Sequence, residues 1–370
     1  MGEDEGTGMP SLIPAFRFGG LNQSVSLAKD NTEIQVSGKT FTGDGEAWLE
    51  LIPRADIIIN TQLKRIPPHV AMPVAIGQTE IDSFVFGGRK IEGFSLGLGG
   101  DVTKQEFELR WCPRSEPIFA RGDNTTIIQD LMFHVFNFKN IQGSRRIRKE
   151  TDSSGHIIEC VDLVADGWTV ELQSLETSRE IFDQLRAEGG YGLTHVGSLK
   201  KTDGSSFSGK DAEEALHSLR FFISFAKGIW CTPICGVGFD NDGNRVWESW
   251  SSPKEAWYRP ISWFDEHHPE QLVTLFPGFM ARWKNEEWRE ALHEVIYWYL
   301  NSNYSPRGID AGIILTQAAI ERLSYAYAVK DRKLLEAKGF KDLRASDKFR
   351  MLFSSLDIPI DIQNSLSEMR

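Results

Sequence analysis

The hydrophobic periodicity of the chain changes near residue 207, and this change most constrains its fold. From Phe16 to about Leu172, short runs of Val, Ile, Thr and Phe alternate with polar residues, as in Thr32–Val36, Ala47–Ile52 and Gln105–Trp111. Alternation with a period of two is typical of strands that bury one face. Turn signals such as Asp44-Gly45 separate the runs. This half is therefore predicted to be antiparallel β, either a sandwich or an open barrel.

Beyond residue 207 the periodicity is helical. Ser208 and Asp211 have the spacing of a capping box, and apolar residues follow at helical spacing until a glycine. Further helices are predicted over Glu286–Leu300, Asp310–Val329 and Ala345–Leu356. In the second of these, Ile313, Ile320 and Leu323 are expected to face a buried core. The predicted fold class is therefore α+β, with a β-rich antiparallel half followed by a helical bundle.

The chain of 370 residues is long enough for about two domains. We expect a flexible tail (1–10), a β-rich recognition domain (11–207), a connecting region with a helix and many tryptophans (208–284), and a helical domain (285–370). Lys and Arg number 41 against 52 Asp and Glu, a net charge of −11, which excludes attraction of the whole protein to nucleic acid or anionic lipid. Without a long apolar run or signal peptide, the chain is expected to be cytoplasmic and not to contact membranes.

Several patterns resemble functional motifs but lack a required residue. The run from Gly204 to Asp211 has the glycines and lysine of a phosphate-binding loop, but an Asp replaces the hydroxyl residue that would hold magnesium. Gly93–Gly97 matches a nucleophile elbow only in its letters, because a turn and a strand follow it. Cys231 and Cys235 have no second pair of zinc ligands, and Asp265–His268 is predicted to be a loop. No metal, no cofactor and no catalytic residue are therefore expected.

Seven of the eleven tryptophans lie within about fifty residues, from Trp247 to Trp298. Exposed aromatic side chains can stack on bases or sugars, whereas buried ones add large apolar area between packed elements. Packing between the two halves is the favoured interpretation. If the zone instead binds a ligand, the candidate residues are Trp247, Trp250, Trp257 and Trp263.

A local excess of positive charge lies between Lys330 and Arg350. This segment contains eight basic and four acidic residues in a chain that is acidic as a whole. A solvated helix face is the simpler interpretation. If any part of the chain binds nucleic acid, the candidates are Lys341, Arg344 and Lys348, which should give weak, salt-dependent RNA binding.

The C-terminal part also resembles a known group of proteins. Residues from about 220 to 360 are similar to the C-terminal part of large bacterial proteins related to the ApeA and HEPN group. The β-rich half resembles only loosely their sensor-like N-terminal regions. The segments that carry the resemblance are Ser262–Asp265, Leu275–Phe279, Tyr297–Leu300, Gly312–Leu323 and Arg344–Lys348.

The resemblance implies a HEPN-like helical bundle, in a family where many members are metal-independent ribonucleases of antiviral or toxin systems. Their chemistry uses Arg-x4-6-His in paired protomers, with the Arg holding the phosphate and the His transferring protons. This sequence lacks that motif, since even Arg289 and His293 are one residue too close. In relatives the motif is expected beyond the Arg344–Pro359 segment. The chain alone, ending at Arg370, is therefore expected to be inactive, either because it stops before the catalytic helix or because this member has no such activity.

Two functions follow from these observations. The first is a defence or toxin-type HEPN-like effector with a β-rich sensor half and RNA as a partner. The alternative is a non-catalytic protein that binds a ligand or partner, with an unidentified small molecule as one candidate. In both, the helical half is expected to form a homodimer.

Overall fold

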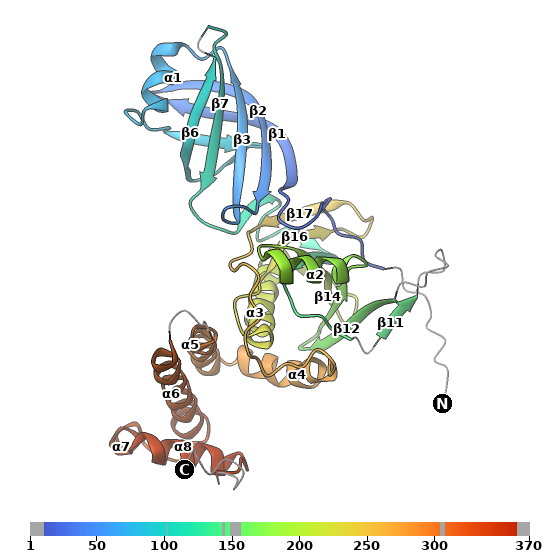
Figure 1. Cartoon of the computed structure of the whole chain (residues 1–370), viewed down its shortest axis with the longest axis vertical. Coiled ribbons are helices and arrows are strands. Elements are labelled where there is room, and N and C mark those ends of the chain that lie inside the picture. Colours follow the sequence, from blue (N-terminus) through green and yellow to red (C-terminus); the bar gives the residue numbers. More distant parts are fainter. Residues whose placement is uncertain (1–10, 102, 143–144, 149–156, 304–307, 361–370) are drawn as a thin grey trace.

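The computed structural model describes residues 11–101, 103–142, 145–148, 157–303 and 308–360, so the predicted flexible tail lies outside the described residues. The α+β prediction is confirmed, because antiparallel sheets dominate the first part of the chain and helices the last. The first sheet lies at one end of the long axis, the second sheet in the middle, and the last helices at the opposite end (Figure 1).

The first sheet contains seven antiparallel strands in the order β5-β4-β1-β2-β3-β7-β6. The predicted strands at Thr32–Val36, Ala47–Ile52 and Gln105–Trp111 overlap β1, β2 and β7, which confirms the strands expected from a period of two. Helix α1 (Pro68–Ala75) lies between β3 and β4. The strands are β1 (Val25–Val36), β2 (Lys39–Glu50), β3 (Asp56–Lys64), β4 (Ser83–Phe86), β5 (Arg89–Lys90), β6 (Gly93–Asp101) and β7 (Glu106–Pro113).

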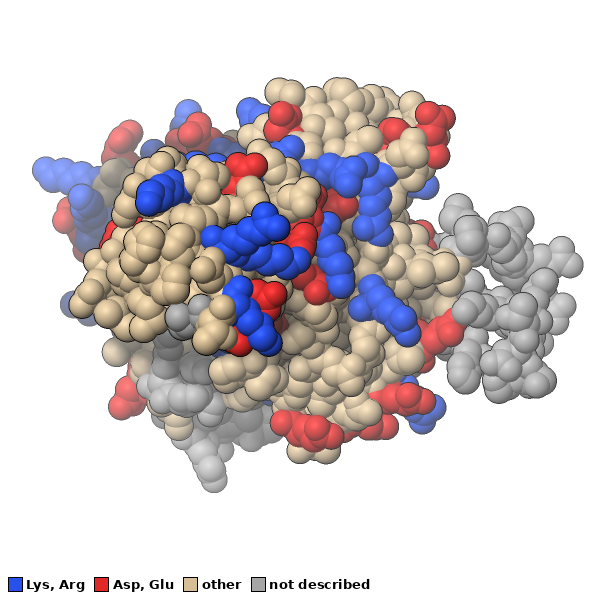
Figure 2. Space-filling view, turned by 90° about the horizontal axis from the view of Figure 1, so that it is seen from above, with Lys and Arg blue, Asp and Glu red and all other residues tan. Residues whose placement is uncertain are grey.

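Charged side chains on this sheet form ion pairs across neighbouring strands. The pairs are Lys29–Glu46, Lys64–Asp44 and Arg110–Glu50, at 3.3, 3.3 and 2.6 Å. Seen from above, the molecule accordingly shows Lys and Arg next to Asp and Glu (Figure 2). Charges mixed in this way create no strong field of one sign.

The second sheet contains eight antiparallel strands in the order β11-β12-β13-β14-β10-β16-β17-β8. Helix α2 (Ser178–Glu188), which the sequence analysis did not predict, packs against β14. The strands are β8 (Ile118–Arg121), β10 (Asp130–Phe136), β11 (Arg145–Arg148), β12 (Ile157–Ala165), β13 (Trp168–Ser174), β14 (Leu193–Lys201), β16 (Pro233–Phe239) and β17 (Arg245–Trp250), with β9 (Ile127–Ile128) and β15 (Phe207–Ser208) forming a separate two-stranded sheet.

The β-rich part does not end at residue 207 as expected. Strands β16 and β17 follow helix α3 (Gly209–Lys227), yet β16 pairs with β10 inside the second sheet and β17 pairs with β8. The expected connecting region, 208–284, therefore supplies part of this sheet. Pairing between strands that are distant in sequence produces no local sequence pattern. The end of the β-rich part could therefore not be located from hydrophobic periodicity.

Helix α3 begins at the predicted capping box. The Ser208 hydroxyl oxygen accepts a hydrogen bond from the Asp211 N–H at 3.2 Å, and the Asp211 carboxylate accepts one from the Ser208 N–H at 3.0 Å. Together these bonds satisfy backbone donors that would otherwise be unpaired at the helix start. The buried residues Ala212, Leu219 and Phe222 of α3 join one core cluster with the second sheet.

The C-terminal helices continue outward from α3 through pairwise contacts. Phe221 of α3 stacks on His293 of α5 with ring centroids 4.3 Å apart. Helix α6 packs against α5, and α8 packs against α6. The helices are α4 (Glu270–Lys284), α5 (Glu286–Ser302), α6 (Ile309–Tyr325), a π-helical turn (Ala326–Asp331), α7 (Ala337–Asp342) and α8 (Ala345–Ser355).

The predicted buried face of the helix from Asp310 is wrong at Ile313. This side chain is 60% exposed, whereas Ile320 and Leu323 are only half-buried. The buried positions of α6 are instead the small residues Ala319 and Ser324. Small side chains let two helices approach closely. The face of α6 that packs against its neighbours is therefore the one with Ala319 and Ser324, and not the one with Ile313.

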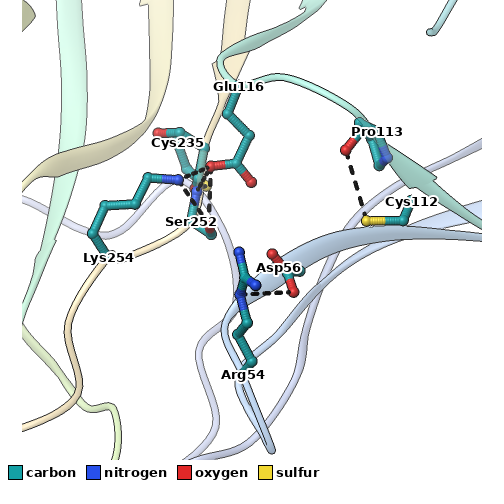
Figure 3. Close-up of polar contacts among 9 residues, drawn as sticks. Arg54, Asp56, Cys112, Pro113, Glu116, Cys235, Ser252 and Lys254 are labelled. Atoms are coloured by element: carbon teal, nitrogen blue, oxygen red, sulfur yellow. Dashed lines mark hydrogen bonds and ion pairs between the residues drawn. The ribbon is translucent and has the colours of Figure 1, made fainter. Parts of the chain in front are cut away.

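A polar junction lies where the chain passes from the first sheet to the second, and it ties the β7–β8 connection to the segment after β17 (Figure 3). Glu116, in the link between β7 and β8, accepts hydrogen bonds from the N–H and the hydroxyl of Ser252, both at 2.9 Å. The Lys254 ammonium donates to the same carboxylate at 2.6 Å. Phe86 and Trp250, with ring centroids 6.2 Å apart, add an apolar contact between the sheets. The Glu116 side chain is only 14% exposed, and its loss would leave the buried N–H and hydroxyl of Ser252 without this acceptor.

We expect Glu116→Ala to lower the free energy of unfolding by about 1.5–3 kcal/mol, the usual range for hydrogen bonds to a charged group. Urea unfolding followed by tryptophan fluorescence measures this difference. The matched control is Glu214→Ala, which removes an exposed ion pair with Lys210 and should cost less than about 0.5 kcal/mol. Equal losses in the two variants would contradict a structural role for the junction.

Candidate functional site

In the described part of the chain, two cavities have room for a small molecule. The larger, of about 530 Å³, is lined in part by the N-terminal segment 11–20, and among the described residues Arg17 and Glu176 are the ionisable ones in its wall. The second, of about 400 Å³, has four cationic and four aromatic side chains in its wall. We call the second cavity the Lys227 pocket; its cations are Lys139, Arg186, Lys227 and Arg259, and its aromatic residues are Phe182, Trp257, Trp263 and Phe264. Of these two cavities, the Lys227 pocket is the one in which several ionisable side chains converge, so it is the stronger candidate for a binding site.

Lys227 is placed in the pocket by the way α3 ends. The next residue, Gly228, ends the helix in the left-handed conformation with φ of 90°. A Cβ atom there would come within 3.0 Å of the Ile261 carbonyl oxygen, so glycine also permits a close approach of the loop that forms the pocket. As the last residue of α3, Lys227 also has its positive charge at the favourable end of the helix dipole.

The Lys227 side chain is buried without a carboxylate partner in the described part of the chain. The residue is 1% exposed, and its ammonium lies 4.2 Å from the centroid of the Trp257 ring. Burial lowers the pKa of Lys227 to about 7, and repulsion from Lys139 and Arg259 adds to this effect, while Cys231 and Glu266 oppose it. At neutral pH the pocket therefore holds both protonated and neutral Lys227.

Lys139 has a different role, since its ammonium is fixed by hydrogen bonds. It donates to the Ser262 hydroxyl and to the Phe264 carbonyl, both at 2.8 Å. Ser262 in turn donates to the Ala226 carbonyl at 2.7 Å, which ties the loop to the end of α3. Burial lowers the pKa of Lys139 as well. Lys139 thus both holds the loop in place and contributes charge to the pocket.

The aromatic walls of the pocket are also held in place. The backbone N–H of Trp257 donates to the Gly190 carbonyl at 2.6 Å, and the centroid of the Trp257 ring lies 5.9 Å from that of the Phe182 ring. The Trp263 indole donates to the Phe225 carbonyl at 3.0 Å. Fixed aromatic surfaces of this kind are suited to the flat apolar part of a ligand.

The rim of the pocket mixes charges. Arg186 and Arg259 are exposed, and Arg186 pairs with Asp183 at 2.9 Å. Arg259 has no ion pair with any described residue. Asp265 and Glu266 lie in the same wall, so the four cations outnumber the acids by two when Lys227 is protonated. This local positive excess contrasts with the net charge of −11 for the whole chain.

Behind the pocket lies His195, which is fully buried. Its Nδ1 is 2.9 Å from the Thr194 hydroxyl, and its Nε2 has no hydrogen-bond partner among the described atoms. Burial, aided by the charge of Lys227, lowers the pKa of His195 to about 3. The imidazole is therefore neutral and adds no further positive charge next to Lys227.

The tryptophans named by the sequence analysis divide into two pairs. Trp247 and Trp250 are fully buried in the two apolar cores, as the packing interpretation predicts. Trp257 and Trp263 line the Lys227 pocket, as the ligand-binding alternative would require. The four cations of the pocket were not predicted. The only local signal was a lysine at position 227, between apolar residues on both sides.

The basic residues proposed for RNA binding differ in their surroundings. Lys348 pairs with Glu321 at 3.2 Å, and its side chain is only 13% exposed. Lys341 and Arg344 are exposed, and neither has an ion pair with a described residue. Of the three residues, Lys341 and Arg344 are therefore accessible to a ligand, whereas Lys348 could contact one only by breaking its ion pair.

The other motif-like patterns have structural roles. Gly93–Gly97 lies in strand β6. Cys231 and Cys235 are free and buried, and burial raises the pKa of each thiol to about 12. Within the described residues no cluster of His, Cys, Asp and Glu could hold a metal ion. The same residues include no helix long and apolar enough to span a membrane.

Comparisons with known proteins point to one group. Residues 123–260 match the family model of the YopA central domain, and residues 285–370 match that of the YopA C-terminal domain. The chain is 25% identical over 361 residues to the "SPbeta prophage-derived uncharacterized protein YopA" of Bacillus subtilis (strain 168), covering 95% of this chain and 79% of that protein. No solved structure matches. The four cations of the Lys227 pocket all fall within the central match, so the pocket lies largely in the part of the chain that is similar to the YopA central domain.

Proposed function

We propose that this chain is a ligand-binding protein whose Lys227 pocket takes a small anionic molecule with a flat apolar part. The observation that carries the proposal is the buried ammonium of Lys227, which has no carboxylate partner in the described residues. A buried charge without a counter-charge destabilises a fold. An anionic ligand would supply that counter-charge, and the aromatic walls would contact its flat part.

The proposal predicts that Lys227 costs stability in the empty protein. Because its pKa falls from 10.5 to about 7 on folding, the unfolded chain binds more protons between these pH values, so the free energy of unfolding rises with pH across this window. We expect Lys227→Met to raise the free energy of unfolding by up to about 4 kcal/mol at pH 7, and by progressively less toward pH 10.

Urea unfolding at several pH values measures this effect. The matched control is Lys201→Met, because the Lys201 ammonium lies over Trp168 at 3.5 Å outside the pocket. The control should show no gain in stability at any pH. A loss of stability in Lys227→Met at pH 7 would mean that the lysine stabilises the empty fold, which is against a role in ligand binding.

Calorimetric titration tests the binding itself. We expect 2-naphthyl phosphate, a flat aromatic anion, to bind more tightly than either 2-naphthol or inorganic phosphate. Lys227→Met should raise its Kd by about 10- to 100-fold, the loss expected for a charge-assisted contact, and Lys200→Gln, an exposed lysine outside the pocket, should leave it unchanged. Affinity should fall as the pH rises through 7, because Lys227 then loses its proton. Equal affinity for 2-naphthol and 2-naphthyl phosphate would contradict the proposal.

The expected homodimer remains part of the proposal for the helical half. Ile313 and Ile314 of α6 are 60% and 67% exposed, and an apolar face of this kind would be covered in a dimer. We expect the double variant Ile313→Glu, Ile314→Glu to shift the protein from dimer to monomer in sedimentation velocity. A wild-type chain that stays monomeric at high concentration would contradict the pairing.

The HEPN-like effector stays a second prediction. In that function the Lys227 pocket would be the sensor, and the C-terminal helices would belong to the part that acts on RNA. Metal-independent cleavage of labelled RNA by this chain would favour that function. It would also contradict the expectation that a chain without Arg-x4-6-His is inactive.

A further inference from the structure

The two lysines of the Lys227 pocket differ in the availability of their nitrogen lone pairs. The Lys139 nitrogen donates hydrogen bonds to two oxygen atoms at 2.8 Å, and such bonds favour its protonated form, although burial acts against it. The Lys227 nitrogen has no hydrogen-bond acceptor among the described residues and lies against an aromatic ring. The arrangement keeps one cation fixed and leaves the other amine free to react.

We infer that Lys227 forms a reversible imine with a small aldehyde or ketone that carries an anionic group. The inference rests on the proposed function, because it names the class of ligand for the same pocket. It depends on geometry: a buried amine lines a cavity of about 400 Å³ and has no carboxylate to hold its proton.

The chemistry balances without an oxidant or a reductant. The lone pair of the neutral Lys227 nitrogen attacks the carbonyl carbon, the carbon–oxygen π electrons move to the oxygen, and a proton passes from nitrogen to oxygen to give a carbinolamine. A proton from solvent then adds to the hydroxyl group, and water leaves as the nitrogen lone pair forms the carbon–nitrogen double bond. The protonated imine returns one proton to solvent to give the neutral imine, so no net proton is consumed. Addition of water reverses both steps.

The rest of the pocket suits such a ligand. While Lys227 is neutral, Lys139 and Arg259 still supply positive charge for the anionic group. The aromatic walls limit the access of water, which would otherwise hydrolyse the imine. Cys231, the nearby thiol, is buried and has a pKa of about 12, so it does not compete as a nucleophile. Protonated Lys227 binds anions and neutral Lys227 reacts with carbonyl carbon, and a pKa of about 7 populates both forms.

The test uses pyridoxal 5′-phosphate as the probe, since it combines an aldehyde, a phosphate and a flat ring. The full chain is incubated with a low concentration of probe at pH 7, the imine is reduced with borohydride, and the modified lysine is identified by peptide mass spectrometry. We expect Lys227 to be labelled at least about tenfold faster than Lys201, because an ordinary lysine is almost fully protonated at this pH. An excess of 2-naphthyl phosphate should protect Lys227 and leave Lys201 unprotected.

Two variants make the test specific. Lys227→Arg keeps a positive charge but cannot form an imine, so it should lose the fast labelling and still bind 2-naphthyl phosphate. Lys201→Arg removes the matched lysine, which lies over a tryptophan outside the pocket. In this variant Lys227 should be labelled as fast as in the wild type. If Lys227→Arg does not fold, the position and the protection of the label in the wild-type chain still decide the question.

The outcomes separate this inference from the proposed function. Labelling of Lys227 no faster than of Lys201, with 2-naphthyl phosphate still bound, overturns the imine and leaves the anion site standing. Loss of both the labelling and the binding overturns both. Fast labelling of Lys227 that 2-naphthyl phosphate does not block would also contradict the inference, because the reacting lysine would then lie outside the ligand's position.

Discussion

The packing of α3 on the second sheet is the contact on which the rest of the structure depends. One face of the helix completes the core with residues such as Leu219 and Phe222. The aromatic stack between Phe221 and His293 attaches the C-terminal helices to it. Its end at Gly228 sets the position of Lys227. The sheet, the helical half and the candidate site therefore share a single structural element.

In the proposed function, the charge of Lys227 serves binding but lowers the stability of this element. A Met or Leu at the same position would complete the core without the cost of a buried charge. Its pKa of about 7 means that the folded protein carries that cost at neutral pH. Buried ionisable groups with displaced pKa values concentrate at sites that bind or react, and this one lines a cavity with three further cations.

Local patterns in the sequence predicted the local structure. The alternation at Thr32–Val36 and the capping box at Ser208 both depend on neighbouring residues, and both were predicted correctly. Contacts between distant segments were not predictable in this way. Strands β16 and β17 rejoin the sheet after a 19-residue helix, and the exposed face of α6 could be identified only when its neighbours were known.

The candidate site was only half predictable for the same reason. Trp257 and Trp263 were named because tryptophans are concentrated in one stretch, although sequence could not separate them from the buried Trp247 and Trp250. The cations of the pocket come from segments near residues 139, 186, 227 and 259. No spacing rule connects such positions, and a lone lysine in an apolar run gives no sign of what lies opposite it.

The pairing of β8 with β17 also has a consequence for synthesis on the ribosome. Ile118 and Trp250 are direct partners at one edge of the sheet, about 130 residues apart in sequence. The side of β8 that pairs with β17 therefore stays unpaired while α3 and the strands before β17 are translated. Contacts of such long range slow folding and expose strand edges to other chains. The nascent protein would be most vulnerable to aggregation during this interval, after the first sheet has emerged and before residue 250 is available.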